Sequence, residues 1–234
     1  MLRCLRRRWR VFSVEAKRRA AKEAVEYVDD GFVVGVGSGT TVSLILSELA
    51  VAGKKVSIIP ASWQSYYEAI ELGLTVSSLD QHPSPDVYLD SFDQVTRDGA
   101  MIKGGGGAML REKVLASASR NRVFVGDHGK LVEKLRRPVP LEIVPFAYKF
   151  VENKLREKGV KLVMRTSQAK NGPTVSDNGN LIGDADFGEI DEPAKVENFL
   201  KRIPGVVESG VFVGLVDTLI IAYDNGKVER LTFR

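Results

Sequence analysis

The segment FVVGVGSGTTVSLILSELA, residues 32–50, decides the fold of this chain. It opens with a short apolar run of the kind that forms a buried strand. Gly37, Ser38 and Gly39 follow as a turn, and apolar residues at helical spacing begin at about Thr40. A strand, a glycine turn and a helix in this order start a βαβ unit, so the segment predicts an α/β fold with a parallel sheet.

Strand and helix patterns alternate on both sides of this segment. A helix with one apolar side is expected over residues 14–28, before the first strand. The other elements of this half are expected as strands at 55–62, 86–92 and 121–127, and as helices at 63–73 and around Glu112. This alternation indicates a Rossmann-like domain built on a parallel sheet.

The pattern changes after Pro138. Residues 137–145 are punctuated by prolines and are expected to be extended. Helices at 146–157 and 193–202 and strands at 161–165 and 181–187 are expected to follow, with a polar turn at 169–180. We therefore expect a small inserted α+β domain, ferredoxin-like in fold, over residues 138–211. Residues 14–137 and 212–234 then form the Rossmann-like domain. Its last segment is expected to be a hairpin with its turn at Asn225–Gly226.

The composition is that of a globular protein. Of the 234 residues, 44% are hydrophobic and 27% are charged, which is ordinary for a soluble domain. No apolar run reaches the roughly 18 residues that span a bilayer, so no membrane association is expected. Cys4 is the only cysteine, which excludes an internal disulfide and favours a reducing compartment, here the cytoplasm.

Positive charge is concentrated at the N-terminus. Residues 1–22 contain nine Lys or Arg and one acidic residue; because the whole chain carries +4, that segment carries +8 and the remainder −4. A mildly acidic body is not expected to bind nucleic acid. Residues 1–13 form a basic extension, for which we favour a disordered segment over a transit peptide or a nucleic-acid-binding arm.

The glycine turn after the first strand is a candidate anion site. Gly35, Gly37 and Gly39 lie where backbone amides and a helix N-terminus can hold a phosphate. The spacing is not that of a dinucleotide-binding fingerprint, and the lysine of a P-loop is absent. The hydroxyls of Thr40 and Thr41 suit a single phosphate, although a tight turn with a hydroxyl cap explains the residues equally well.

Two acidic residues end the third strand. Asp90 and Asp93 stand in LDSFDQV, and ligands of open α/β sheets bind outside the carboxyl ends of the strands. Local evidence alone favours aspartates that cap the exit from the strand.

The fourth strand also ends in polar residues. Asp127, His128 and Lys130 stand in GDHGK. A histidine in such a loop is most often a surface residue. Because His82, His128 and Cys4 are the only histidines and cysteine, a His/Cys metal site is not expected.

Four glycines follow one lysine in IKGGGGAMLREKVLA, residues 102–116. Glycine costs a helix or strand roughly 0.5–1 kcal/mol relative to alanine, so the run suggests that the bare backbone has a use. Consecutive amides there can meet an anion at close range, beside the charge of Lys103. In the following helix, periodicity places Glu112 roughly opposite the expected buried residues, on the solvent side. Those expected buried residues are Leu110, Val114, Leu115 and Ala118.

Several motifs in fixed order point to one family. GVGSGTT at 35–41, DSFDQ at 90–94 and KGGGGAMLREK at 103–113 resemble the ribose-5-phosphate isomerases of the A type, which carry G-x-G-[ST]-G-[ST]-T, D-G-A-D-E and K-G-G-G-[GA]-A-x-x-x-E-K. The resemblance covers nearly everything from about residue 15 to the end. Further matching segments are PASWQS (60–65), GDHGK (126–130), VPLEIVP (139–145), GPTVSDNGN (172–180) and IPGVVESGVF (203–212).

The resemblance implies roles position by position. It implies a catalytic base at Glu112, an oxyanion-stabilising lysine at Lys103, and two acids, Asp90 and Asp93, of which Asp90 helps to open the sugar ring. The substrate-binding residues that it implies are Ser38, Gly39, Thr40, Thr41, Gly104, Gly105, Gly106, Lys130 and Lys17.

The activity implied by the resemblance is the interconversion of D-ribose 5-phosphate and D-ribulose 5-phosphate through an enediolate, in the non-oxidative pentose phosphate pathway. No metal or organic cofactor is implied, because the adjacent carbonyl already acidifies the proton that is removed. We expect a homodimer or a homotetramer whose partner is a small-molecule sugar phosphate.

The chain departs from the family pattern between the two acids. Ser91, Phe92 and Gln94 replace the family's Gly, Ala and Glu. We expect the Phe92 ring to pack into the sheet rather than turn toward the pocket. These changes keep three alternatives open: an isomerase for another sugar phosphate, a deaminase-like relative on the same fold, or a sugar-phosphate-binding protein with weakened activity.

Overall fold

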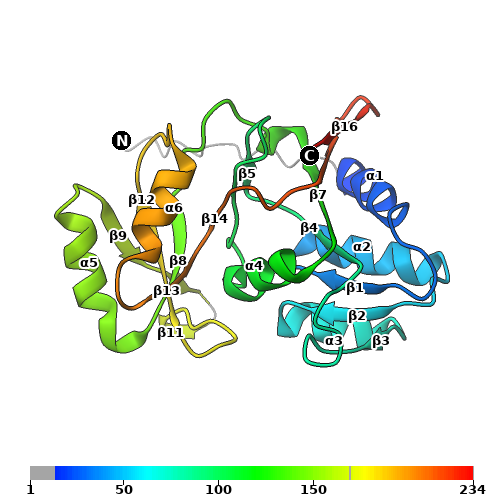
Figure 1. Ribbon diagram of the computed structural model, residues 1–234, viewed down its shortest axis with the longest axis horizontal. Helices are drawn as coiled ribbons and strands as arrows, with labels where there is room; N and C mark the ends of the chain where they lie inside the picture. The colour runs from blue at the N-terminus through cyan, green and yellow to red at the C-terminus, as the bar shows by residue number, and fades with distance from the viewer. Residues whose placement is uncertain (1–13, 169, 234) are drawn as a thin grey trace, which may run out of the picture.

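The computed structural model describes residues 14–168 and 170–233. The basic extension expected at residues 1–13, including Cys4, lies outside the described residues. Figure 1 shows two lobes side by side, with the amino-terminal helices around one sheet and two later helices around another. Within residues 14–168 and 170–233, every helix is too short or too polar to cross a membrane.

A seven-stranded sheet, in the order β16-β15-β7-β4-β1-β2-β3, forms the centre of the larger lobe. All neighbouring strands are parallel except β15 and β16, which pair antiparallel as the expected hairpin around Asn225–Gly226. Parallel strands end at one edge of the sheet, so the loops that follow them meet there. The strands are β1 Val33–Val36, β2 Ser57–Pro60, β3 Thr75–Val76, β4 Val87–Asp90, β7 Asn121–Asp127, β15 Thr218–Ala222 and β16 Val228–Thr232.

The two faces of this sheet carry different helices. Alternate strand residues such as Val34 and Leu89 join the core beneath α1 (Val14–Val25) and α2 (Thr40–Val51). The residues between them face α4 (Met109–Ala118); Tyr88 packs there with Leu115. Because side chains alternate along a strand, Asp90 shares the face of Tyr88 and therefore of α4. The remaining helix of this lobe, α3 (Trp63–Glu71), contacts β2 and β3.

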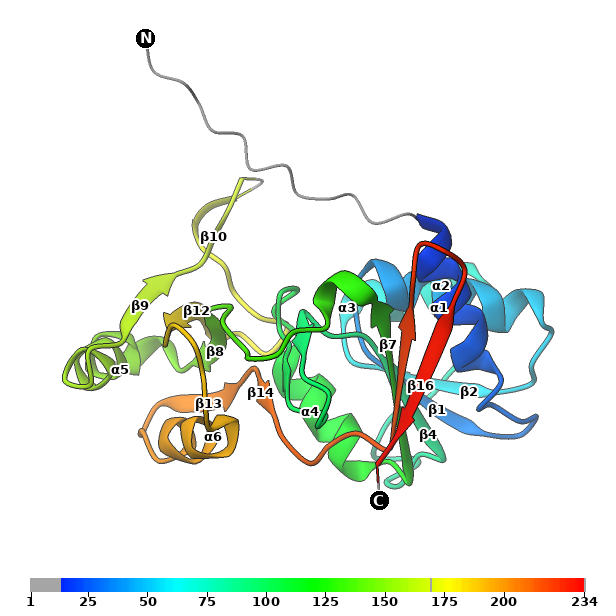
Figure 2. The same cartoon turned by 90° about the horizontal axis from the view of Figure 1, so that it is seen from above.

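The smaller lobe has the order β8-α5-β9-β12-α6-β13. Its antiparallel sheet runs β13-β8-β12-β9, which is the strand order expected of a ferredoxin-like unit. A short hairpin of β10 and β11 lies between β9 and β12, and Figure 2 shows β10 extending away from both sheets. The elements are β8 Val139–Ile143, α5 Tyr148–Arg156, β9 Lys161–Met164, β10 Thr166–Ser167, β11 Lys170–Pro173, β12 Leu181–Asp186, α6 Pro193–Lys201 and β13 Val206–Ser209.

A small antiparallel sheet, β14-β6-β5, lies between the lobes. Gly210 joins β13 to β14; it donates from its amide to Pro140 O (2.7 Å) and accepts from Lys103 N (2.8 Å). A Cβ at Gly210 would lie 2.1 Å from Lys103 O, so only glycine fits this crossing. The strands of this small sheet are β5 Gln94–Val95, β6 Met101–Ile102 and β14 Val211–Phe212.

The expected helices and strands occur in the expected order, but their ends differ. The polar turn expected at residues 169–180 contains the strand β11. The first helix stops at Val25 instead of residue 28. The helix expected from residue 146 starts at Tyr148, after a 3-10 turn at Pro145–Ala147. A second 3-10 turn, His128–Lys130, follows β7. The proposed division of the chain into two domains stays a prediction.

The Phe92 ring packs into the core, as expected. Phe92 is 2% exposed and belongs to the cluster of apolar side chains on the α4 face. A Cβ at Gly126 would lie 2.5 Å from its Cζ atom, so the ring occupies the space that this glycine of β7 leaves open. Phe92 also contributes to the lining of the pocket described below.

This packing predicts that Phe92→Ala lowers the free energy of unfolding by about 3–5 kcal/mol, because it leaves a cavity in a finished core. Urea denaturation would measure the loss. Phe146→Ala is the matched control: Phe146 is 100% exposed, and its removal is expected to change stability by less than about 0.5 kcal/mol. Equal losses for the two variants would contradict the packing role.

Candidate active site

One pocket collects most of the residues singled out in the sequence. It lies where the loops after β1, β4 and β6 meet the start of α4 and the turn after β7. Asp90 lies beneath the pocket, in contact with Lys103, and Lys17 is outside its lining. The lining residues are Ser38, Gly39, Thr40, Thr41, Ser91, Phe92, Asp93, Lys103, Gly104, Gly105, Gly106, Glu112 and Lys130.

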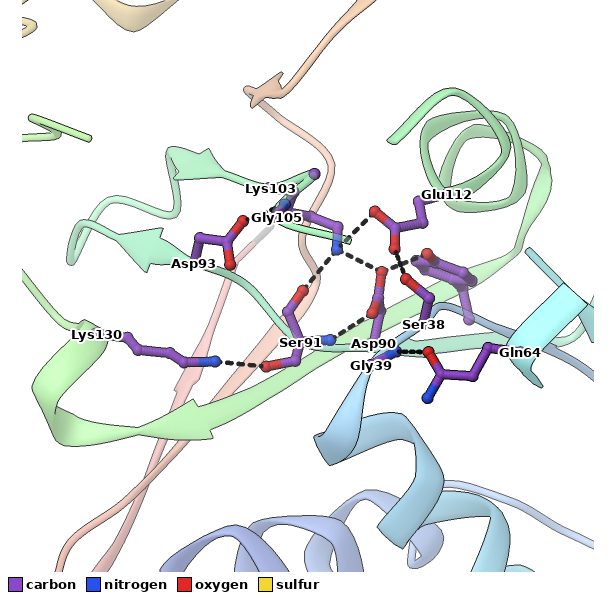
Figure 3. A network of polar contacts seen from close by, with 12 residues as sticks. Ser38, Gly39, Gln64, Asp90, Ser91, Asp93, Lys103, Gly105, Glu112 and Lys130 are labelled. Carbon is purple, nitrogen blue, oxygen red and sulfur yellow. Dashed lines mark hydrogen bonds and ion pairs between the residues drawn. The ribbon is translucent and has the colours of Figure 1, made fainter. Parts of the chain in front are cut away.

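The floor of the pocket is a buried ion cluster (Figure 3). Lys103 Nζ lies 2.6 Å from Asp90 Oδ2 and 3.1 Å from Glu112 Oε2. It also donates a 2.7 Å hydrogen bond to Ser91 O. The three charged side chains are 4% exposed or less, so two carboxylates share one ammonium group away from water. When both acids are ionised, the two carboxylates and one ammonium therefore leave a single net negative charge.

The environment changes the pKa values of two of these groups. Burial raises the pKa of Glu112 to about 7, against the opposing effect of the Lys103 charge and with a further increase from Asp90. Burial lowers the pKa of Lys103, but the charges of Asp90 and Glu112 outweigh it, and the net shift is upward. Lys103 therefore stays charged while Glu112 titrates near neutral pH, as a general base requires.

Hydrogen bonds hold both carboxylates in place. Ser38 Oγ donates to Glu112 Oε1 at 2.6 Å. Asp90 accepts from the Tyr88 hydroxyl (2.5 Å) and from Ser91 N (2.7 Å). A Cβ at Gly37 would lie 2.0 Å from Asp90 Oδ1, so the turn after β1 approaches the carboxylate closely because glycine stands there.

Periodicity misplaced Glu112. The carboxylate is 3% exposed, whereas Val114, which was expected to be buried, is 44% exposed. Glu112 and Lys113 of α4 point inward, where both find polar partners. Next to Glu112, Lys113 Nζ donates to Glu197 Oε1 (2.7 Å), Glu208 Oε1 (2.9 Å) and Val211 O (2.7 Å). A pattern based on apolar residues cannot register such polar burial.

The glycine run of residues 104–107 packs closely against Asp93. Gly105 N donates to Asp93 Oδ2 at 2.8 Å, and a Cβ at Gly105 would lie 2.8 Å from Asp93 Oδ1. Gly104 and Gly107 have φ values of 97° and 80°, which favour glycine. Close approach to a carboxylate and left-handed backbone thus account for three of the four glycines.

Lys130 provides a positive charge in the lining of the pocket. Lys130 Nζ donates to Ser91 Oγ at 3.3 Å. Its pKa is lowered, first by burial and further by the charges of Lys17 and Lys103, although Asp127 and Asp93 raise it. Lys17, the other lysine expected to bind substrate, does not line the pocket.

Two residues that touch the site were not found from the sequence. Tyr88 precedes Asp90 by two positions, so strand alternation already placed both side chains on one face. Arg165 follows β9 in the smaller lobe and donates to Gly104 O (2.8 Å) and Gly105 O (3.0 Å). It is about 60 residues away from these partners in sequence, and no local pattern links them.

Comparisons with known proteins agree with one family. The model of the family Ribose 5-phosphate isomerase A (phosphoriboisomerase A) matches residues 57–226. Ribose-5-phosphate isomerase A of Archaeoglobus fulgidus is 44% identical over 211 residues, which cover 87% of this chain and 93% of that protein. Its counterpart in Methanothermobacter thermautotrophicus is 42% identical over 215 residues, covering 90% and 95%.

Solved structures give the same result. A D-ribose-5-phosphate isomerase in complex with phospho-erythronic acid superposes with a TM-score of 0.90 at 35% identity, covering 94% of this chain and 98% of that one. Ribose 5-phosphate isomerase A from Methanocaldococcus jannaschii has a TM-score of 0.89 at 35% identity, covering 94% and 99%. The shared fold and the sequence identity lead to one conclusion: the chain belongs to the ribose-5-phosphate isomerase A family.

Proposed function

We propose that this protein is an aldose–ketose isomerase that interconverts ribose 5-phosphate and ribulose 5-phosphate. The observation that carries the proposal is the buried cluster of Glu112, Lys103 and Asp90 at the floor of the pocket. A base with a pKa of about 7 lies beside a permanent positive charge. That pair suits removal of a proton next to a carbonyl, with stabilisation of the oxyanion that results.

We assign the steps of the mechanism to these groups from the family resemblance. Ionised Glu112 takes the proton from C2 of the open-chain aldose and returns it to C1 of the enediolate. Lys103, together with glycine amides, stabilises the negative oxygen; donors of this kind contribute about 2.7–4 kcal/mol each. Asp90 assists ring opening and passes protons between oxygens, and Asp93 holds the glycine turn and positions hydroxyls. No metal or organic cofactor takes part in this scheme, and its absence stays a prediction.

The phosphate is proposed to lie at the start of α2. Gly39, which precedes that helix, makes no side-chain cap to its amides, so the N-terminal amides of α2 are available to an anion. Thr40 and Thr41 line the same end of the pocket. Lys130 and Lys17 add positive charge, which further favours a phosphate.

Ser91 and Phe92, which stand where the family has Gly and Ala, line the pocket without filling it. The Phe92 ring lies mainly in the core, and Ser91 holds Lys103 and Lys130 through its carbonyl and hydroxyl oxygens. This arrangement favours an active isomerase over a weakened binding protein, since a binding protein has no use for a base with the pKa of Glu112. We also propose a cytoplasmic location and a homodimer or homotetramer; light scattering of the purified protein would measure the oligomer.

Glu112→Gln is expected to abolish turnover and to preserve binding of sugar phosphate. The amide has the size of the carboxylate and still accepts from Ser38, but it cannot take a proton. A ribose 5-phosphate to ribulose 5-phosphate assay and calorimetric titration with a substrate analogue would measure the two effects. Turnover at the wild-type rate in this variant would remove Glu112 from the mechanism.

The kcat/KM value is expected to rise with pH and to level off above about 7. Only the ionised form of Glu112 accepts a proton, and its pKa of about 7 sets the midpoint. The hydrogen bond from Ser38 lowers this pKa, so Ser38→Ala should move the midpoint of the profile to higher pH. A profile that is flat between pH 5 and 8 would contradict the assignment of the base.

Lys103→Met is expected to lower kcat more than it raises KM, because the charge matters most once the enediolate has formed. Steady-state kinetics would separate the two constants. A change confined to KM would reassign Lys103 as a phosphate anchor. Circular dichroism of the variant is needed alongside, since the substitution leaves Asp90 and Glu112 buried without their cation.

A further inference from the structure

The glycine run forms a tight turn whose local sequence permits two conformations. Gly107 N donates to Gly104 O at 3.0 Å, and the central peptide joins Gly105 to Gly106. Type I and type II turns differ by a flip of this peptide, and type II needs a positive φ at the third residue. Glycine adopts that φ at no steric cost, so the run itself does not choose between the two turns.

The structure contains one of the two conformations. The φ angle is positive at Gly104 and Gly107 but not at Gly105 or Gly106, as in a type I turn. Whatever holds the central peptide must therefore come from outside the glycine run.

Arg165 contacts the Gly105 carbonyl, which belongs to the central peptide, and also the Gly104 carbonyl before it. Its Nη1 atom donates to both Gly104 O and Gly105 O. Its other edge is fixed by Asp184 of β12, which accepts from Nε at 2.9 Å and from Nη2 at 2.5 Å. The side chains of Arg165 and Asp184 are 18% and 28% exposed. The planar guanidinium is thus oriented by one bidentate pair while it binds two consecutive carbonyls.

We propose that Arg165 is a positioning residue that selects the turn conformation and so directs the Gly106 amide into the pocket. In a trans peptide the C=O and the following N–H point in opposite directions. Holding Gly105 O on the Arg165 side therefore turns Gly106 N–H toward the opposite side. Gly106 lines the pocket there, and a Cβ on it would lie 3.4 Å from Ser38 Oγ.

The same geometry explains the bond between Gly105 N and Asp93, since Arg165 holds the preceding carbonyl of Gly104. The value of the Gly106 amide to catalysis rests on the proposed isomerase function, in which it stabilises the developing oxyanion. The conformational part of the inference stands independently of that function.

The test compares Arg165→Met with Arg122→Met. Arg122 forms a similar bidentate pair with Asp217 through Nε (2.8 Å) and Nη2 (2.7 Å), at 24% and 32% exposure, but contacts no glycine of the turn. Both variants should lose comparable stability. Only Arg165→Met is expected to lower kcat for ribose 5-phosphate tenfold or more, with KM changed less than threefold. Arg165→Lys should lower kcat by an intermediate amount, because an ammonium group cannot contact both carbonyls and the carboxylate at once.

Selective 15N-glycine labelling gives a readout that does not depend on activity. In Arg165→Met the amide signals of Gly105 and Gly106 should shift, broaden or double, and in Arg122→Met they should not. Unchanged glycine signals, or a kcat loss equal to that of Arg122→Met, would overturn the proposal. If Arg165→Met does not fold, the same criteria apply to Arg165→Lys. If the wild-type protein fails to convert ribose 5-phosphate, the proposed function falls, whereas the glycine signals still decide the role of Arg165.

Discussion

The site depends on the ion cluster in which Lys103 pairs with both Asp90 and Glu112. Burying an ion costs several kcal/mol, and attraction offsets this cost only when the partners are close and hydrogen-bonded. Here Ser38, Tyr88 and the backbone of Ser91 satisfy most of the remaining oxygen atoms. Burial raises the pKa of Glu112 to about 7, against the opposing charge of Lys103 and with a further increase from Asp90. Stability and chemical reactivity at this site thus have the same physical source.

Three glycines allow the chain to surround this cluster. Gly37 brings the turn after β1 against Asp90, Gly105 brings the turn after β6 against Asp93, and Gly210 lets β13 and β14 pass beside Lys103. In each place a methyl group would overlap a neighbouring atom. The cost of glycine in backbone entropy is therefore offset by polar contacts that no larger residue permits.

The smaller lobe contacts residues of the site without lining the pocket. Lys113 fixes α4 to α6 and β13, and this side chain follows Glu112 directly. Arg165 holds the glycine turn from the end of β9. Both contacts join lobes whose residues are distant in sequence, so the geometry of the pocket reflects the packing of one sheet unit against the other.

Local sequence by itself determined the element order and most of the pocket. Alternating strand and helix patterns require a parallel sheet, and parallel strands place Ser38, Asp90 and Lys130 at one edge. The tertiary structure alone decided that Glu112 turns inward, because its partners Lys103 and Ser38 come from other elements. Burial against polar partners leaves no periodic pattern of apolar residues in the sequence. It also decided the conformation of the glycine turn. Glycines specify no backbone state of their own, so that choice depends on Arg165, a side chain brought in from the other lobe.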